Sequence, residues 1–546
     1  MTAEAQTVAE QLIESLIERG VDTLFALPGV QLDPFFDAVA RAPELRVVHT
    51  RHEQTTSYMA FGYAQATSRP GVCVVVPGPG ITHAGAGLAT AWATYTPVLL
   101  IAGELFGGRD ARGTGALHEI PNQTAVIEGT IGHSRPITSP DGVIDALDDA
   151  FDRLSGPEVR PAAIEISPDV LRAEAPAPKA ATVTTQAAPS VSMTDAIAAA
   201  IRDAQQPLII VGGGARACGP AVQELADRLG APIVTSRSGK GVVDDRLSTV
   251  LPHVAAFPLV RAADVVVVVG SRFGVNDLGR GELDDRTTVV RIDTDDQRAA
   301  ESMPNGATTL PMAGDAATAV SALLASEINS APAPWRDQAA QLRTEIFETM
   351  AVEFPVTWQC ANAVRAALPD DGILVDEMTQ VAYLARNAPV AYHPEGYVNS
   401  GIQGTLGFGY PTALGAKIGR PDRAVVSISG DGGFGYNIGE LATAAHHGIG
   451  VVAVVFTDGA FGNVKGMQQR VYGHDIATDL TNPDYVALAA SFGITGAQVD
   501  DLDQLEATIA AGIEADTPMV IEVPIGAQPY IWPRLQGQKQ FDLPSG

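Results

Sequence analysis

Short runs of apolar residues alternate with stretches of helical periodicity along most of the chain. In residues 5–20, Val8, Leu12 and Leu16 recur at helical spacing and Gly20 follows as a C-cap, so this segment is expected to form a helix. Apolar runs bounded by glycine or proline turns indicate buried strands. In the first part of the chain, such strands are expected at 23–27, 46–49, 72–76, 98–102 and 162–166.

The same alternation recurs in two further blocks. A segment rich in Ala, Pro and Thr at 175–190, interpreted as a linker, separates the first two, and the second fades into an Ala/Pro-rich stretch at 330–335. Strands are expected at 207–215, 231–236, 263–270, 288–293, 372–376, 424–433, 451–459 and 519–523. Strands that alternate with helices favour parallel sheets. The predicted fold class is therefore α/β, with three doubly wound parallel-sheet domains at 1–172, 190–330 and 350–530.

The composition narrows the class of protein. The 546 residues include 35 basic and 63 acidic side chains, which gives a formal net charge of −28. This balance argues against a nucleic-acid or membrane-surface partner, because both attract basic proteins. Cys73, Cys218 and Cys360 lie far apart, without the spacing of a zinc site or a disulfide framework. The N-terminal segment lacks an apolar core and no run is long enough to cross a bilayer, so we expect a soluble, cytoplasmic protein.

The sharpest chemical signal lies in residues 430–464. The strand at 424–429 leads into a Gly-Asp-Gly-Gly turn that contains Asp431, and the strand at 451–456 leads into a second acidic turn with Asp458. In open α/β sheets, ligands bind at the carboxyl ends of the strands. Two carboxylates beside glycines that free backbone amides are suited to a divalent cation and a diphosphate. Gly-Asp-Gly alone could be a simple turn, and the second acidic turn is what favours a site.

The stretch 430–464 resembles the signature of the thiamine-diphosphate (ThDP) enzymes. The resemblance implies that Mg²⁺ is bound by Asp431, Asp458 and the carbonyl of Ala460. It also implies a pyrimidine-binding, a central and a diphosphate-binding domain. Asp458 departs from the family pattern, in which this ligand is usually Asn, and it adds negative charge beside the diphosphate.

The family also requires a glutamate in its first domain, and the segment 51–72, with its His-Glu-Gln and Gly-Tyr-Ala, resembles that region. A glutamate such as Glu53 at a helix start is ordinarily a solvated residue favoured by the helix dipole. The resemblance instead implies that Glu53 hydrogen-bonds N1′ of the pyrimidine and so activates the cofactor. Further cofactor contacts implied by the family's motifs are Gly80, Met378, Thr379, Gln380, Gly404, Leu406, Gly432, Gly433, Ala460, Phe461 and Gly462.

Within this family, the layout most resembles acetolactate (acetohydroxyacid) synthase large subunits. Decarboxylation of a small 2-oxo acid followed by carboligation is therefore expected. A decarboxylase or a 2-hydroxy acid or aldehyde lyase of the same family remains open, as does a catalytically inactive subunit. His118 lies where the synthases carry a glutamine, and His83 lies within the segment 76–85, near the turn that contacts the pyrimidine. Both are candidate catalytic residues, although each could be an ordinary surface histidine.

The remaining predictions concern the oligomeric state, a possible FAD site and a pair of adjacent histidines. The resemblance implies a homodimer or homotetramer, with ThDP between the first domain of one subunit and the third of another. The glycine triplet 212–214 follows a strand, as in dinucleotide-binding turns, and leaves FAD possible, with Arg272 and Asp293 similarly placed. The pair His446-His447 is interpreted as structural, on an amphipathic helix.

Overall fold

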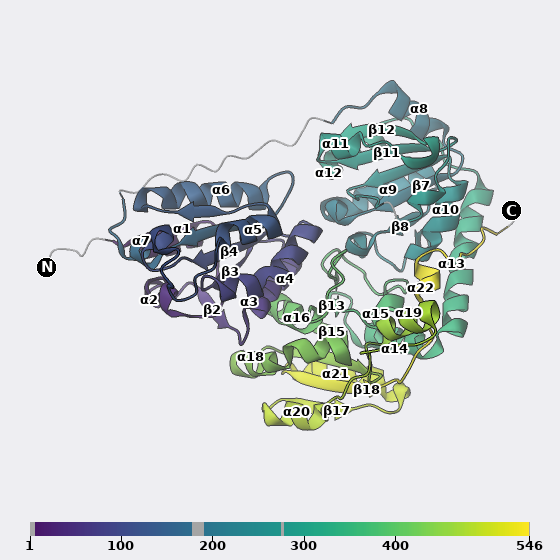
Figure 1. The fold of residues 1–546 in the computed structure, drawn as a ribbon. Helices are drawn as coiled ribbons and strands as arrows, with labels where there is room; N and C mark the ends of the chain where they lie inside the picture. Colours follow the sequence, from purple (N-terminus) through teal and green to yellow (C-terminus); the bar gives the residue numbers. More distant parts are fainter. Residues whose placement is uncertain (1–5, 177–190, 275–277, 545–546) are drawn as a thin grey trace.

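The computed structural model describes residues 6–176, 191–274 and 278–544, and contains three six-stranded sheets (Figure 1). All strand pairs within these sheets are parallel. The prediction of an α/β fold with three parallel sheets is confirmed. The segment 175–190, interpreted as a linker, lies almost wholly outside the described residues. No helix in the described ranges has both the length and the apolar character needed to cross a membrane.

The first sheet has the strand order β2-β1-β3-β4-β6-β5. Its strands are β1 (Thr23–Ala26), β2 (Arg46–His49), β3 (Gly71–Val75), β4 (Val98–Gly103), β5 (Arg135–Ile137) and β6 (Ala162–Ile166). Its helices are α1 (Val8–Glu18), α2 (Asp33–Val39), α3 (Glu53–Thr67), α4 (Pro79–Thr94), α5 (Gln123–Ile131), α6 (Val143–Ser155) and α7 (Pro168–Arg172). The expected N-terminal helix is present as α1, which Thr7 caps in a capping box with Glu10.

The second sheet has the order β12-β11-β10-β7-β8-β9. Its strands are β7 (Pro207–Val211), β8 (Ile233–Thr235), β9 (Val250–Leu251), β10 (Val265–Val269), β11 (Thr288–Asp293) and β12 (Thr308–Ala313). Its helices are α8 (Asp195–Asp203), α9 (Gly219–Leu229), α10 (Ala256–Ala262), α11 (Asp296–Ala299) and α12 (Ala316–Leu324). The central strand β10 consists of five buried valines, as expected for a parallel strand covered on both faces.

The third sheet has the order β14-β13-β15-β16-β18-β17. Its strands are β13 (Ile373–Asp376), β14 (Tyr397–Val398), β15 (Val425–Gly430), β16 (Val451–Thr457), β17 (Thr495–Gln498) and β18 (Met519–Pro524). Its helices are α14 (Pro355–Ala367), α15 (Gln380–Ala385), α16 (Gly409–Gly419), α17 (Asp431–Phe434), α18 (Leu441–His447), α19 (Gly462–Tyr472), α20 (Tyr485–Ser491), α21 (Leu505–Ala515) and α22 (Trp532–Leu535). The long helix α13 (Ala333–Glu353) precedes this block.

The first and third sheets are joined by close packing of α3 on α16. A Cβ added at Gly62 would lie 2.0 Å from the carbonyl oxygen of Thr412, and one at Gly415 would lie 2.0 Å from that of Met59. Only glycine therefore permits the two helix backbones to approach this closely. The contact continues into one shared hydrophobic core, where the rings of Phe61 and Phe408 lie 5.5 Å apart. This packing brings the start of α3, with Glu53, to the third domain.

Candidate active site

The two acidic turns meet at one edge of the third sheet. β15 and β16 are neighbouring parallel strands, so Asp431, the first residue of α17, and Asp458, which follows β16, lie side by side. Asp431 is 3% exposed, and its Oδ2 accepts hydrogen bonds from Gly459 N at 2.8 Å and Asn482 Nδ2 at 2.6 Å. Its Oδ1 accepts one from Gly432 N at 2.9 Å. The carboxylate predicted from the sequence is thus fixed in one orientation.

The negative charges of the two neighbouring carboxylates repel each other, and a bound cation would relieve this repulsion. Burial, together with the nearby charge of Asp431, raises the pKa of Asp458 to about 6. A Cβ at Gly462 would lie 2.2 Å from Asp458 Oδ2, so glycine is needed beside this carboxylate. Two carboxylates and the Ala460 carbonyl form an all-oxygen set, which is what Mg²⁺ prefers. These residues therefore fit a bound Mg²⁺, and it is they that would hold the ion.

Two partnerless polar atoms fit a diphosphate near this edge. Gln380 Oε1, after β13, and Asn463 Oδ1, after β16, are buried without a hydrogen-bond partner in the described part of the chain. Each side-chain amide also carries two N–H donors, and a half-turn about its last side-chain bond would present these donors to an anion at the same position. Gly432 and Phe461, two more of the predicted cofactor residues, are neighbours: a Cβ at Gly432 would lie 2.7 Å from the Phe461 ring.

Glu377 lies next to the predicted site residues, and the sequence analysis assigned it no role. It is fully buried after β13, and its Oε1 accepts a hydrogen bond from Gly407 N at 2.7 Å. Its Oε2 accepts from Gly409 N at 2.8 Å and from the Ser429 hydroxyl at 3.1 Å. Glu377 therefore fixes the backbone that follows Leu406. A buried acidic residue between an apolar strand and the predicted contact residues 378–380 was the available signal.

Glu377 also lies against Gly433, where a Cβ would be 1.8 Å from its Oε1. Gly433 therefore has a packing reason to be glycine, whether or not it touches a cofactor. Burial raises the pKa of Glu377 to about 7, although the hydrogen bonds from Gly409 and Gly407 act in the opposite direction.

We expect Glu377→Gln to destabilise the protein by about 1–3 kcal/mol, because an amide N–H₂ replaces an acceptor facing a backbone N–H. The loss should depend on pH. The pKa of Glu377 is raised on folding, so the stability that the neutral wild-type carboxyl contributes is full below its ordinary value and is lost as pH rises through about 7. Glutamine has no such dependence. Thermal unfolding of both proteins should give a larger gap at pH 5 than at pH 8, and a gap that widens with pH would contradict this account.

The loop before α16 lies against the segment after β13. Gly404 has a φ of +55°, in the left-handed region, and a Cβ there would lie 3.7 Å from Met378 Sδ. Leu406 is half-buried, and the next carbonyl, of Gly407, accepts a hydrogen bond from Asn437 Nδ2 at 2.5 Å. Met378 and the Gly404–Leu406 loop, predicted from separate motifs, are thus neighbours.

Glu53 begins α3 and is paired with His83. His52 is the N-cap residue of this helix, and its ring accepts a hydrogen bond from Gln54 N at 3.1 Å. The side chain of Glu53 is 12% exposed, and its Oε2 lies 2.9 Å from His83 Nδ1. His83, on α4, has a side chain that is 47% exposed. The pair can exchange a proton between a buried carboxyl and an imidazole in contact with solvent.

His118 lies in the loop between β4 and α5. It has a φ of +71°, and its Nδ1 is buried without a hydrogen-bond partner among the described residues. Its carbonyl closes on Gly78, where a Cβ would lie 2.1 Å away, so the loop contacts the turn that begins α4. Gly80, in α4, packs on the end of β3: a Cβ there would lie 3.2 Å from Cβ of Val75, the last residue of that strand. His118 is thus held next to the 76–85 turn with one ring nitrogen free.

The predicted site residues form two groups. Glu53, His83, Gly80 and His118 belong to the first domain, and the remaining predicted cofactor and metal residues belong to the third. In the described ranges, no hydrogen bond or ion pair joins Glu53 to Asp431 or Asp458.

A separate cavity of about 410 Å³ is lined by residues of the first and central domains and by the segment 399–402 of the third. The glycine triplet 212–214 lines it, together with Arg272 and Asp293. Asp293 pairs with Arg298, which also contacts Glu158 of the first domain at 3.2 Å. The glycine triplet, Arg272 and Asp293, which the sequence analysis considered together for FAD, therefore line the same cavity.

Comparison with known proteins agrees with this geometry. Three family models match: "Thiamine pyrophosphate enzyme, N-terminal TPP binding domain" at residues 6–126, the central domain at 194–323, and the C-terminal TPP binding domain at 378–523. The chain belongs to the thiamine pyrophosphate (ThDP) enzymes, as the sequence resemblance predicted. It is accordingly an enzyme of the decarboxylase and carboligase type, and it binds thiamine diphosphate.

Curated relatives match nearly the whole chain. A probable 2-ketoarginine decarboxylase from Pseudomonas aeruginosa is 31% identical over 529 residues, covering 95% of this chain and 94% of the relative. The acetolactate synthase large subunit of Parasynechococcus marenigrum is 31% identical over 575 residues, covering 98% and 91%. The acetolactate synthase isozyme 2 large subunit of Escherichia coli is 29% identical over 549 residues, covering 96% of each chain.

Proposed function

We propose that the protein is a ThDP- and Mg²⁺-dependent enzyme that decarboxylates a small 2-oxo acid and joins the remaining carbon unit to a second 2-oxo acid. The observation that carries the proposal is the meeting of two carboxylates, the buried Asp431 and the half-buried Asp458, at one sheet edge, together with the separate Glu53–His83 pair. The first pair suits a metal-bound diphosphate, and the second suits proton transfer.

The roles of the residues follow from their contacts. When bound, thiamine diphosphate supplies the electron sink that stabilises the carbanion left by loss of CO₂. Glu53 holds a proton at the pyrimidine N1′, and His83 exchanges that proton with solvent through its 2.9 Å contact. Glu377 fixes the loop that carries Leu406, and with the cofactor bound the Gly404 carbonyl would accept a hydrogen bond from the aminopyrimidine. His118, whose Nδ1 has no partner among the described residues, would contact the substrate.

We also propose that the active unit is a homodimer or homotetramer. The first-domain and third-domain residue groups share no hydrogen bond or ion pair within the described part of one chain, which supports a site completed by a second copy. Sedimentation of the active protein tests this, since an active monomer would remove the proposal.

Incubation with pyruvate, ThDP and Mg²⁺ tests the reaction. Carboligation yields acetolactate, detected as acetoin after acidification. If free acetaldehyde forms instead, the enzyme is a decarboxylase, and if neither forms, pyruvate is not the donor. An Asp431→Ala variant run in parallel identifies any background condensation.

Decarboxylation with release of an aldehyde is the second candidate. Formation of an aldehyde requires that a proton be delivered to the reacting carbon, whereas carboligation requires that a second carbonyl compound bind there. The half-exposed side chain of His83 could supply such a proton from solvent, and this favours aldehyde release. The relative described as a probable 2-ketoarginine decarboxylase makes 2-ketoarginine the first alternative substrate to assay. A lyase acting on a 2-hydroxy acid or aldehyde is tested with benzoin-type and 2-hydroxyacyl substrates. Absence of turnover with every donor would favour an inactive subunit.

FAD in the 410 Å³ cavity remains a prediction. The cavity offers Arg272 and the glycine turn 212–214. A Cβ at Gly212 would meet the Gly270 carbonyl at 2.1 Å, so close backbone packing by itself requires glycine at that position. The absorption spectrum of the purified protein, and of the supernatant after denaturation, decides whether a flavin is present.

A further inference from the structure

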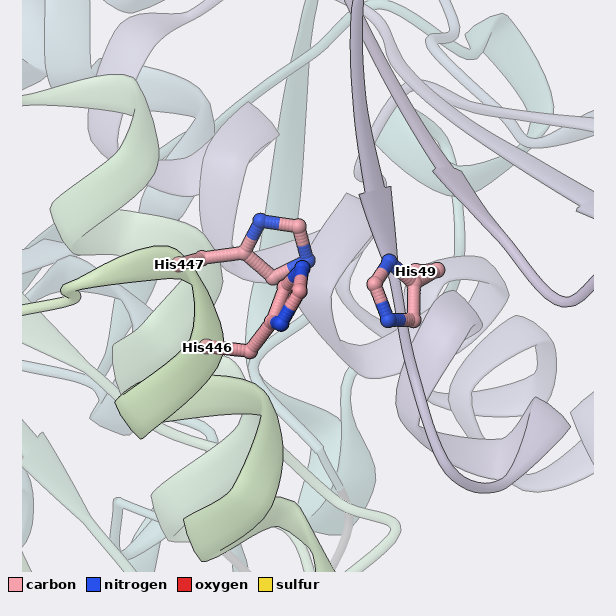
Figure 2. Close-up of side chains that lie close together, drawn as sticks. All are labelled: His49, His446 and His447. Atoms are coloured by element: carbon pink, nitrogen blue, oxygen red, sulfur yellow. The ribbon is translucent and has the colours of Figure 1, made fainter. Parts of the chain in front are cut away.

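Three histidines converge where the first domain meets the third, away from the residue groups described above (Figure 2). His49 ends β2, and His446 and His447 end α18. The ring of His49 lies 4.6 Å from that of His446 and 4.8 Å from that of His447, and the two neighbouring rings lie 4.7 Å apart. One ring nitrogen of each residue lies within 4.8 Å of the other two.

One of these nitrogens is buried without a partner. Nε2 of His447 has no hydrogen-bond partner in the described ranges, whereas the same ring interacts with the His49 backbone. A histidine that donates one ring N–H to a backbone carbonyl presents a lone pair at the other nitrogen, which is the usual arrangement of a metal ligand. Metal binds to the neutral form of such a ring.

We propose that His49, His446 and His447 form a binding site for a divalent transition metal, with Zn²⁺ as the ion that fits best. Zinc–nitrogen bonds of about 2.0–2.1 Å in a tetrahedron place the ligand nitrogens roughly 3.4 Å apart. The rings have to close by roughly an ångström from their present separation, and rotation about the side-chain torsions provides this. The exposed ring of His446 leaves the fourth position open to water and gives the ion a path from solvent.

The ligand type selects the metal. The cluster contains imidazoles and, among the described residues, no carboxylate within the same distance, so it does not suit Mg²⁺ or Ca²⁺, which prefer oxygen. Arg46 and Arg51 are the charged groups that act on these rings, and both oppose a cation. The formal charge of −28 over the whole chain acts in the opposite direction. A site with three neutral nitrogens beside two arginines requires a metal that forms strong bonds to imidazole.

The bound ion would link the first domain to the third. His49 belongs to the first sheet and the histidine pair to the third domain, and Arg51 N already donates a hydrogen bond to Glu440 across the same junction at 3.2 Å. Of the three proposed ligands, His49 lies four residues before Glu53 in the sequence. The interpretation of His446 and His447 as purely structural is thereby extended to a ligand role.

Zinc binding to the full-length protein, loaded with ThDP and Mg²⁺, tests the site. We expect one Zn²⁺ per chain by equilibrium dialysis at micromolar protein. His446→Gln, an exposed position that should fold normally, and His447→Phe, which keeps a ring, should each weaken binding at least about tenfold. His474→Asn, a change at an exposed histidine outside the cluster, is the matched control and should bind as the wild type does. Unchanged zinc binding in both cluster variants overturns the proposal.

Cobalt separates this site from two others. Co²⁺ in a tetrahedral nitrogen site absorbs strongly in the visible range, whereas in an octahedral oxygen site such as Asp431–Asp458 it absorbs weakly. His52, Glu53 and His83 form a second group with metal-ligand spacing, so His83→Asn is tested beside His446→Gln. The proposal requires that the cobalt spectrum and the zinc-induced rise in unfolding temperature persist in His83→Asn and disappear in His446→Gln. The reverse pattern, or no zinc-induced rise in wild type, overturns it.

Discussion

Replacing Glu53 with glutamine is expected to lower kcat by about 10²–10⁴-fold, the range of a general acid–base contribution. Glutamine keeps the size and can still contact His83, but it cannot hold the proton that Glu53 exchanges at the pyrimidine N1′. Folding and most of the ThDP affinity should therefore be retained. The decisive measurement is exchange of the thiazolium C2 proton in deuterated water, because it reports activation of the cofactor before any substrate is bound.

His118→Ala is the matched control for this experiment. Its free Nδ1 lies on a loop and not on α3, so the substitution should change substrate preference and kcat while C2 exchange stays at the wild-type rate. Wild-type exchange in Glu53→Gln would show that Glu53 is not the activating group. Slowed exchange in His118→Ala would show that the two side chains act as one unit.

Asp431→Ala is expected to abolish retention of Mg²⁺ and ThDP, with more than about 100-fold loss of metal affinity, because it removes a ligand and not merely a supporting residue. It also leaves the N–H groups of Gly432 and Gly459 and the Asn482 amide without their acceptor. Titration calorimetry with ThDP at fixed Mg²⁺, and ThDP retained after gel filtration, measure the loss independently of turnover.

Two variants separate ligation from positioning at this edge. Asn482→Ala removes only the 2.6 Å hydrogen bond to Asp431 and should cost about 10–100-fold in metal affinity. Asp458→Asn should be tolerated, because it keeps an oxygen donor, restores the residue usual in the family, and removes the negative charge that Asp458 places beside Asp431. Normal ThDP affinity in Asp431→Ala would show that the metal site lies elsewhere.

Much of the architecture could be predicted from local sequence. Central strands such as β10 and β16 are uninterrupted apolar runs, and the turns that end them are marked by glycine or aspartate. The hydrophobic pattern missed five strands, and each of them lies at a sheet edge: β5, β9, β12, β14 and β17. Such strands are short or carry polar residues, as in the Thr495–Gln498 strand, so their apolar signal is weak.

What the sequence by itself determined is the set of features that depend on neighbours along the chain. Asp431 and Asp458 each follow a buried strand directly, and parallel strands deliver their carboxyl ends to one edge, so their proximity needs no further information. Only the tertiary structure decided which distant groups meet them or meet one another. The Asn482 amide on Asp431 and Glu377 on the Gly407 and Gly409 amides depend on how loops far apart in the sequence fold against one another within the third domain. The position of His49 beside His446 and His447 depends on how the first domain packs against the third. Contacts of this kind are fixed by tertiary packing, which leaves no periodic signal in the sequence.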